Sequence, residues 1–140
     1  MPPDRTPENL ASFRLYQAKE CLQSAEREFA AGSFKAAANR SYYCIFHSMR
    51  AVLALERFDS RKHSGIMSAF RKDYIRNGIF PAEFSKIVGD AFEIRNDSDY
   101  EDFFIVPKAS VAAQLENAKT FLAAVEKYIA PKLKKTHTET

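Results

Sequence analysis

The chain has 140 residues, of which 46% are apolar and 28% charged, the composition of one soluble globular domain. Its net charge of +3, from 21 bases and 18 acids, is too small to identify a nucleic-acid-binding protein by itself. No apolar run reaches the roughly 18 residues of a membrane span, and the first residues lack the pattern of a secretory signal. The two cysteines, Cys21 and Cys44, indicate reduced thiols. We therefore expect a cytoplasmic protein.

The first apolar pattern predicts a long helix that begins at Pro7 and ends at Gly32. Thr6 stands at the capping position before Pro7, which suits the first helical position. Apolar residues then recur at alternating spacings of four and three: Ala11, Leu15, Ala18, Leu22, Ala25 and Phe29. This spacing forms one apolar stripe, so we expect the helix to pack along a single side.

A second helix is predicted from Ser33, as its cap, to about Glu56. Its middle, SYYCIFHSMRAVLAL, is apolar on most sides, so this helix should lie at the centre of the fold. A loop is expected at residues 58–62, then a shorter helix from about 63 to 74, and a turn at Asn77-Gly78.

Two further patterns complete the prediction. Pro81 opens a fourth helix that leads into Arg95, with apolar residues Phe84, Ile87, Val88, Ala91, Phe92 and Ile94. After a connection at 101–106, Pro107 starts a last helix with the stripe Val111, Leu115, Ala118, Leu122, Val125 and Ile129. This stripe matches the first, so the two helices should pack side by side. We predict an all-α, up-and-down bundle of about five helices in one domain, with its core at about 7–130 and a polar, frayed tail at 131–140.

Two sets of side chains have the spacing of metal ligands, and a metal-free interpretation is favoured for both. The soft candidates are Cys21, Cys44, His47 and His63. They include one close pair, whereas a structural zinc site usually takes two. The oxygen candidates are Asp90, Glu93 and Asp97. They could hold magnesium on one helix face, but a solvated face has the same pattern. We therefore predict no metal and no cofactor.

The segment EIRNDSDYEDFF places a cluster of polar groups after an apolar helix face. The Arg95 guanidinium can hold a phosphate through two parallel hydrogen bonds and stabilise developing charge. Asn96 supplies a donor and an acceptor, and Tyr100 would stack over Asn96 if the helix continues. These three residues are the candidate catalytic groups. The alternative for Arg95 is an ion pair with Asp99 or Glu93 at helical spacing.

Three stretches together resemble the HEPN domain family: AAANRSYYCIFHSMRAVL, RKHSGIMSAF and AFEIRNDSDYEDF. They occur in the expected order, and the resemblance covers roughly residues 10 to 130. It implies a bundle of about five helices that pairs into a symmetric homodimer. It further implies a partner, a minimal nucleotidyltransferase that acts as the antitoxin of a toxin–antitoxin pair. Many such proteins cut RNA without a metal.

The family motif is an arginine, one polar residue, three variable residues and a histidine. Arg95 and Asn96 match its first two positions, and Tyr100 stands where the histidine is expected. Tyrosine, with a pKa of about 10, is a poor base at pH 7, and loss of an acid–base group typically costs about 10² to 10⁴ in rate. His63 or His47 could approach Arg95 in the folded dimer, although packing and capping roles are favoured. We keep His63 as a weaker candidate for phosphate binding.

Two hypotheses follow from this motif. The first is a dimeric HEPN toxin acting on RNA through Arg95. The second is a catalytically inactive HEPN protein that binds nucleotides or serves as a scaffold for the nucleotidyltransferase. In some relatives a tyrosine two residues beyond the motif histidine receives adenylate from the partner. Asp102 takes that place here, so Tyr100 is the nearest hydroxyl that could be adenylylated.

Overall fold

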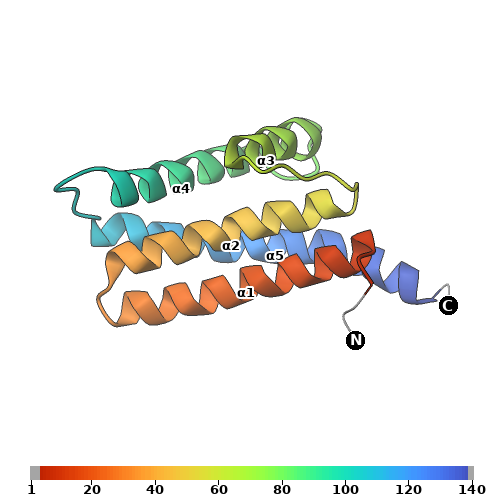
Figure 1. Cartoon of the computed structure of the whole chain (residues 1–140), viewed down its shortest axis with the longest axis horizontal. Coiled ribbons are helices and arrows are strands. Elements are labelled where there is room, and N and C mark those ends of the chain that lie inside the picture. The colour runs from red at the N-terminus through yellow and green to blue at the C-terminus, as the bar shows by residue number, and fades with distance from the viewer. Residues whose placement is uncertain (1–3, 139–140) are drawn as a thin grey trace.

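A computed structural model describes the backbone of residues 4–138 and the side chains up to residue 133, and this part of the chain is helical and contains no strand. The elements are α1 (Pro7–Ala30), α2 (Phe34–Ala54), α3 (His63–Phe70), the π-helical turn η1 (Arg71–Ile75), α4 (Glu83–Tyr100) and α5 (Lys108–Thr138). Figure 1 shows the long helices running along the long axis of the molecule, with α3 and α4 together on one side of α2. The predicted all-α bundle of about five helices is confirmed.

Helix α2 lies at the centre of the bundle, as its apolar composition predicts. It packs against α1, α3, α4 and α5. Side chains on several of its faces are fully buried, among them Tyr42, Ile45, Met49 and Leu53. Helices α1 and α5 also contact each other, as their matching stripes predict, and Lys19 and Glu126 form an ion pair of 3.4 Å between them. The spacing of apolar residues therefore specified the main helix neighbours.

A cluster of aromatic rings holds α3, η1 and α4 against α5. The rings of Phe84 on α4 and Phe121 on α5 stack with their centroids 4.7 Å apart. Phe70 packs on Phe80 at 5.3 Å and on Phe121 at 5.5 Å. These buried rings fix the position of α4 beside α2, and thereby decide where its polar end lies.

The beginning of α1 and its end agree with the sequence, and Ser33 stands at the predicted cap position of α2 but does not cap it with its side chain. The Thr6 hydroxyl accepts a hydrogen bond of 3.1 Å from the Asn9 amide, and Gly32 takes a φ of +81° that ends α1. The Ser33 side chain makes no capping hydrogen bond. Its φ of −90° and ψ of 77° differ from the extended conformation that aims a capping oxygen at the first free N–H groups.

The start of α4 and the end of α5 also differ from the prediction. Helix α4 starts at Glu83, after Pro81, and ends at Tyr100, directly before the predicted connection at 101–106. Helix α5 does not end at Pro131 but continues to Thr138, while the rest of the predicted tail, 139–140, lies outside the described residues. Proline removes one backbone donor, and the turns on either side of it keep their own hydrogen bonds.

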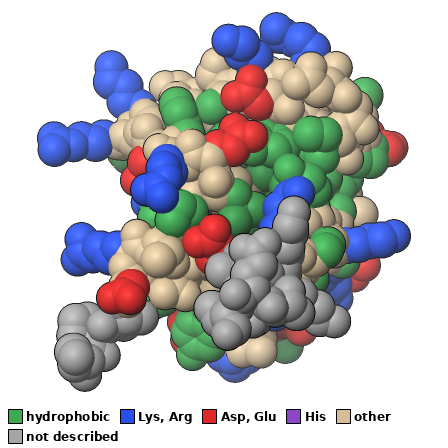
Figure 2. Space-filling model, turned by 90° about the vertical axis from the view of Figure 1, so that its right-hand side faces the viewer, with side chains coloured by type: hydrophobic (Ala, Val, Ile, Leu, Met, Phe, Trp, Pro, Cys, Tyr) green, Lys and Arg blue, Asp and Glu red, His purple; other side chains and the backbone are tan. Residues whose placement is uncertain are grey.

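The described part of the chain has no helix that is long and apolar enough to cross a membrane. Figure 2 views the molecule from the right-hand side of Figure 1, and there hydrophobic side chains gather in the middle of the face while Lys and Arg project around it. Single apolar side chains at a surface are normal, and basic groups around them keep that face hydrated.

Candidate functional site around Arg95

The side chain of Arg95 extends from α4 toward the aromatic side chains of α2. Its Nη2 donates a hydrogen bond of 3.2 Å to the Tyr43 hydroxyl. The guanidinium carbon lies 5.7 Å from the Tyr42 ring centroid and 5.6 Å from that of Tyr43. The side chain is 17% exposed, so the cation rests on two ring faces while one edge remains accessible to solvent.

The other contacts of Arg95 are local. Its Nη1 lies 3.4 Å from the Asn96 Oδ1, a long hydrogen bond. Its Nε lies 3.1 Å from the Asp99 Oδ2, so the ion pair with Asp99 that spacing allowed is present. The Nε–H does not point at that oxygen in hydrogen-bond geometry. Arg95 and Asp99 therefore form an ion pair in which the Nε–H makes no hydrogen bond within the described part of the chain. The Asp99 carboxylate offsets part of the positive charge of Arg95 that would attract a phosphate.

His63 reaches the same pair of tyrosines from the start of α3. Its Nδ1 lies 2.6 Å from the Tyr42 hydroxyl, and its ring stacks on Phe46 with a centroid separation of 4.2 Å. Burial lowers the pKa of His63, and the positive charges of Arg95 and Arg50 lower it further. The imidazole is therefore neutral at pH 7 and held in a defined orientation.

Tyr42 and Tyr43 connect these two groups, and sequence reasoning gave them no role. They are consecutive in α2 and point about 100° apart around the helix. Tyr42 is fully buried and bonded to His63, whereas Tyr43 is only partly buried and bonded to Arg95. The available signal was the YY pair in an apolar helix, because a buried tyrosine hydroxyl usually needs a hydrogen-bond partner.

Tyr100 and Asn96 lie next to Arg95, as the motif predicts. Tyr100 is 73% exposed, and its ring centroid lies 6.0 Å from the Arg95 guanidinium carbon. The Tyr100 ring therefore makes a cation–π contact with Arg95, whereas the sequence predicted that it would stack over Asn96. The three candidate residues of the segment therefore meet around one guanidinium, and His63 joins them from another helix.

His47 lies on the other side of Tyr43. Its ring centroid is 5.9 Å from that of Tyr43, and the Arg40 guanidinium covers the same tyrosine at 5.2 Å. The buried Nδ1 of His47 has no hydrogen-bond partner among the described residues. Burial lowers the His47 pKa to about 4, helped by Arg50 and Arg40.

The side chains considered as metal ligands have other contacts. Cys21 and Cys44 are buried free thiols, and burial raises the pKa of both. Asp90 pairs with Lys86 at 2.7 Å. Among the described residues, no three His, Cys, Asp or Glu side chains converge in a way that could hold a metal ion.

The fold and the site together define a small helical-bundle protein with a basic and aromatic site where α2, α3 and α4 meet. A sequence model of the HEPN domain matches residues 11–134. The chain belongs to the HEPN domain family, and the resemblance found in the sequence is confirmed.

Three relatives show how far this similarity extends. A UPF0332 protein of Thermotoga maritima is 30% identical over 122 residues, which cover 87% of this chain and 92% of the relative. A protein of Methanocaldococcus jannaschii named "Putative toxin MJ0142" is 25% identical over 118 residues, covering 84% of this chain and 80% of the relative. A UPF0332 protein of Archaeoglobus fulgidus is 28% identical over 110 residues, covering 79% and 87%. The similarity thus spans most of each chain.

Proposed function

We propose that this chain is the HEPN component of a toxin–antitoxin pair with a minimal nucleotidyltransferase, and that it acts on RNA through a phosphate site formed by Arg95 and His63. One observation carries the proposal: these residues come from different helices and meet on Tyr42 and Tyr43. Membership of the HEPN domain family and the relative named "Putative toxin MJ0142" support the toxin assignment.

Arg95 is suited to exchange its present partners for a phosphate. Its Nη2 is bonded to a neutral hydroxyl, that of Tyr43, and its contact with Asn96 is long. Hydrogen bonds between a guanidinium and a phosphate are charge-assisted and roughly twice as strong as neutral ones. Asp99 at the Nε edge would meanwhile hold the guanidinium in place. A phosphate approaching the Nη edge therefore gains a bidentate contact without breaking the ion pair.

His63 can supply the group that the motif lacks. Its Nδ1 is engaged by Tyr42, while Nε2 has no partner among the described residues. When the Tyr42 hydroxyl donates to Nδ1, Nε2 carries the proton and can donate to a phosphate oxygen. In the other tautomer Nδ1 donates to Tyr42, and Nε2 can accept a proton. The same ring can therefore bind phosphate or act as a general base.

The activity that we propose for this arrangement is metal-independent RNA cleavage. In the proposed reaction, His63 Nε2 takes the proton of a ribose 2′-hydroxyl as the 2′-oxygen attacks the adjacent phosphorus. The 2′-O–P bond forms, the P–O5′ bond breaks, and the 5′-oxygen leaves with a proton from water. Arg95 stabilises the charge that develops on the phosphate oxygens. Tyr100, at the motif's histidine position, would act by contact with the ribose or phosphate instead of as a base.

We further propose a homodimer in which two Arg95 side chains face one cleft. The connection between α4 and α5 supports an interface near this site, because Phe103 and Ile105 are 101% and 85% exposed. Large apolar side chains gathered at a surface mark interaction sites, and two-fold pairing would double the phosphate-binding groups. Analytical sedimentation at tens of micromolar tests this, and a monomer there would contradict it.

The inactive nucleotide-binding protein, or scaffold for the nucleotidyltransferase, is the second candidate. It is favoured by the Arg95–Asp99 pair, which already offsets the arginine charge, and by Tyr100 in the histidine position. Incubating the protein with labelled single-stranded RNA in EDTA separates the two candidates. If the first candidate is correct, the wild type cleaves the RNA, the variants Arg95→Ala and His63→Gln do not, and the variant His47→Gln still does. Binding without cleavage would establish the second candidate.

The nucleotidyltransferase pairing is tested through Tyr100. Its exposure makes the hydroxyl accessible to a modifying enzyme, and an adenylate there would place negative charge and bulk against Arg95. Incubation with ATP and the partner nucleotidyltransferase should add one adenylate at Tyr100, seen by mass spectrometry, and Tyr100→Phe should prevent it. An adduct on Tyr16, which is also exposed, would show that accessibility alone directs the reaction.

A further inference from the structure

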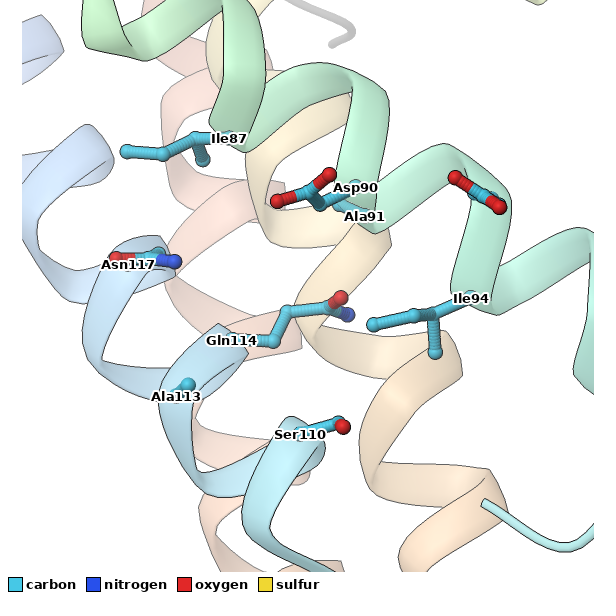
Figure 3. Close-up of a pocket in the computed structure, with 9 residues that line it drawn as sticks. Ile87, Asp90, Ala91, Ile94, Ser110, Ala113, Gln114 and Asn117 are labelled. Atoms are coloured by element: carbon cyan, nitrogen blue, oxygen red, sulfur yellow. The ribbon is translucent and has the colours of Figure 1, made fainter. Parts of the chain in front are cut away.

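A cavity lies between α4 and α5, and Arg95 and His63 do not line it. Its volume is about 250 Å³. It is lined by Ile87, Asp90, Ala91, Glu93 and Ile94 of α4 and by Ser110, Ala113, Gln114 and Asn117 of α5. Figure 3 shows Gln114 extending from α5 toward Ile94 of α4, into the space below Asp90. An engineered apolar cavity of about 150 Å³ holds a benzene molecule, so this one has room for a ligand of side-chain size.

Gln114 gives the cavity an unmet acceptor. The side chain is buried, with 4% of the residue exposed. Its Nε2 donates to the Ala38 carbonyl oxygen at 3.0 Å and to the Ser41 Oγ at 2.7 Å. Because the Ala38 carbonyl can only accept, the orientation of the amide is determined, and the oxygen Oε1 is left buried with no partner among the described residues. A buried acceptor of this kind is stabilised by any ligand that brings a donor.

The remaining polar groups make the cavity suited to a cation. Asp90 and Glu93 are three residues apart on α4, hence on neighbouring turns of one face about 4.5 Å apart along the axis. Both are exposed carboxylates at the wall of the cavity. The neighbouring cation, Lys86, pairs with Asp90 from a side chain that is 79% exposed, and such pairs exchange readily with solvent. The lining of one cavity therefore includes two acidic side chains and the Gln114 amide.

We propose that this cavity binds a guanidinium group. A guanidinium carries five N–H donors in one plane, which allows it to bond to acceptors from two helices at once. It is also more weakly hydrated than an ammonium, which suits a cavity whose walls include Ile87 and Ile94. In the bound state its inner edge donates to Gln114 Oε1, and its outer edge lies against Asp90 and Glu93. The guanidinium comes from a free small molecule or from an arginine side chain of a protein.

Titration of the ¹⁵N-labelled full chain with methylguanidine tests the site. The side-chain amide signals of Gln114 and Asn117 should shift in a saturable way, and methylammonium should bind more weakly. Asp90→Asn with Glu93→Gln should weaken binding by about tenfold or more, since charged hydrogen bonds are lost. The matched control is Glu83→Gln, an exposed acid on the same helix and outside the cavity, which should bind as the wild type does.

Sedimentation of the wild type and of the double variant identifies the source of the group. Weaker self-association of the double variant assigns the guanidinium to an arginine of a second copy, and unchanged self-association assigns it to a free molecule or another protein. The proposal is overturned if methylguanidine causes no saturable shift, or if the double variant binds it as tightly as the wild type does. In both cases the cavity holds water only.

Discussion

Arg14 and Arg95 are both arginines with largely buried side chains, 6% and 17% exposed, yet they contact very different partners. Arg14 on α1 donates to the carbonyl oxygen of Arg50 on α2 and to the Asp59 carboxylate in the following loop, at 3.1 and 3.0 Å. The polar contacts of Arg95 are with two neighbours on its own helix and one tyrosine hydroxyl. Its guanidinium also lies against three tyrosine rings. The comparison teaches that partners, more than burial, separate an arginine that holds a fold together from one available to a ligand.

The physical basis is the cost of losing each set of partners. Without Arg14, the Arg50 carbonyl oxygen loses a charged donor. The Asp59 carboxylate keeps only its longer contact of 3.5 Å with the Arg50 Nη2. Without Arg95, Asp99 and Asn96 remain on the surface of α4, where water can take the place of the guanidinium. We therefore expect Arg14 to govern stability and Arg95 to govern binding.

The largest effect should come from Arg14→Ala. The Arg14 guanidinium is buried, although the Asp59 carboxylate is half exposed. Loss of its two charge-assisted hydrogen bonds should lower the free energy of unfolding by about 2 kcal/mol. Urea denaturation measures this change. Arg27→Ala, which removes an exposed arginine from the same helix, is the matched control and should cost less than about 1 kcal/mol. If the two variants are equally stable, Arg14 has no special role and the contrast with Arg95 fails.

The stability of the protein should fall in acid because His47 lies close to several arginines, among them Arg14. The His47 pKa is lowered to about 4, with contributions from burial, Arg50, Arg40 and Arg14. The unfolded histidine has a pKa of about 6.5, so between these values the unfolded state binds more protons than the folded state. The stabilisation is present above pH 6.5 and is lost as the pH falls toward 4, by about 2 kcal/mol for this partly exposed side chain.

Chemical denaturation at pH 7 and at pH 4.5 measures that loss. Other groups titrate in the same range, so the quantity to compare is the loss in the wild type minus the loss in His47→Gln. Equal losses in the two proteins would show that His47 does not carry the acid sensitivity. Arg14→Met should raise the His47 pKa, because one positive charge is removed.

Arg95→Ala should give the opposite result to Arg14→Ala. The melting temperature should change less than in Arg14→Ala, because Asp99 and Asn96 stay at the surface of α4, where water can replace the guanidinium. Binding of single-stranded RNA should fall by about tenfold or more, since a bidentate contact is lost. Arg95→Lys should not restore it, because an ammonium lacks the planar fork. If Arg95→Ala unfolds, Arg95 has a structural role, and the proposed difference between Arg95 and Arg14 is wrong.

The smallest effect should separate the two tyrosines. Tyr42→Phe removes the hydroxyl that orients His63, and should cost about 1 kcal/mol of stability and weaken RNA binding a few-fold. Tyr43→Phe removes only an acceptor of Arg95 and should leave binding close to that of the wild type. Filter binding and thermal melts on both variants measure this difference. Equal effects on RNA binding would mean that His63 takes no part in the site.

The sequence by itself determined the helices and the family. Apolar spacing of three and four, with Pro7 and Gly32 at the ends of α1, depends on neighbouring residues alone, and the structure follows it closely. The same is true of the Arg95–Asp99 contact, because helical spacing brings residues four apart together. Errors occurred where several local outcomes have similar energies, as at the Ser33 cap and at Pro131.

Only the tertiary structure decided which distant groups meet. His63 lies beside Arg95 because α3 and α4 pack on the same side of α2, and that packing depends on rings such as Phe84 and Phe121. No periodicity in the sequence encodes this, since the two residues belong to separate helices joined by loops. The acceptor of Gln114 is left free for the same reason, because its amide is held by groups of α2. Local spacing specifies a helix and its faces, whereas the contacts between faces depend on the packing of the whole bundle.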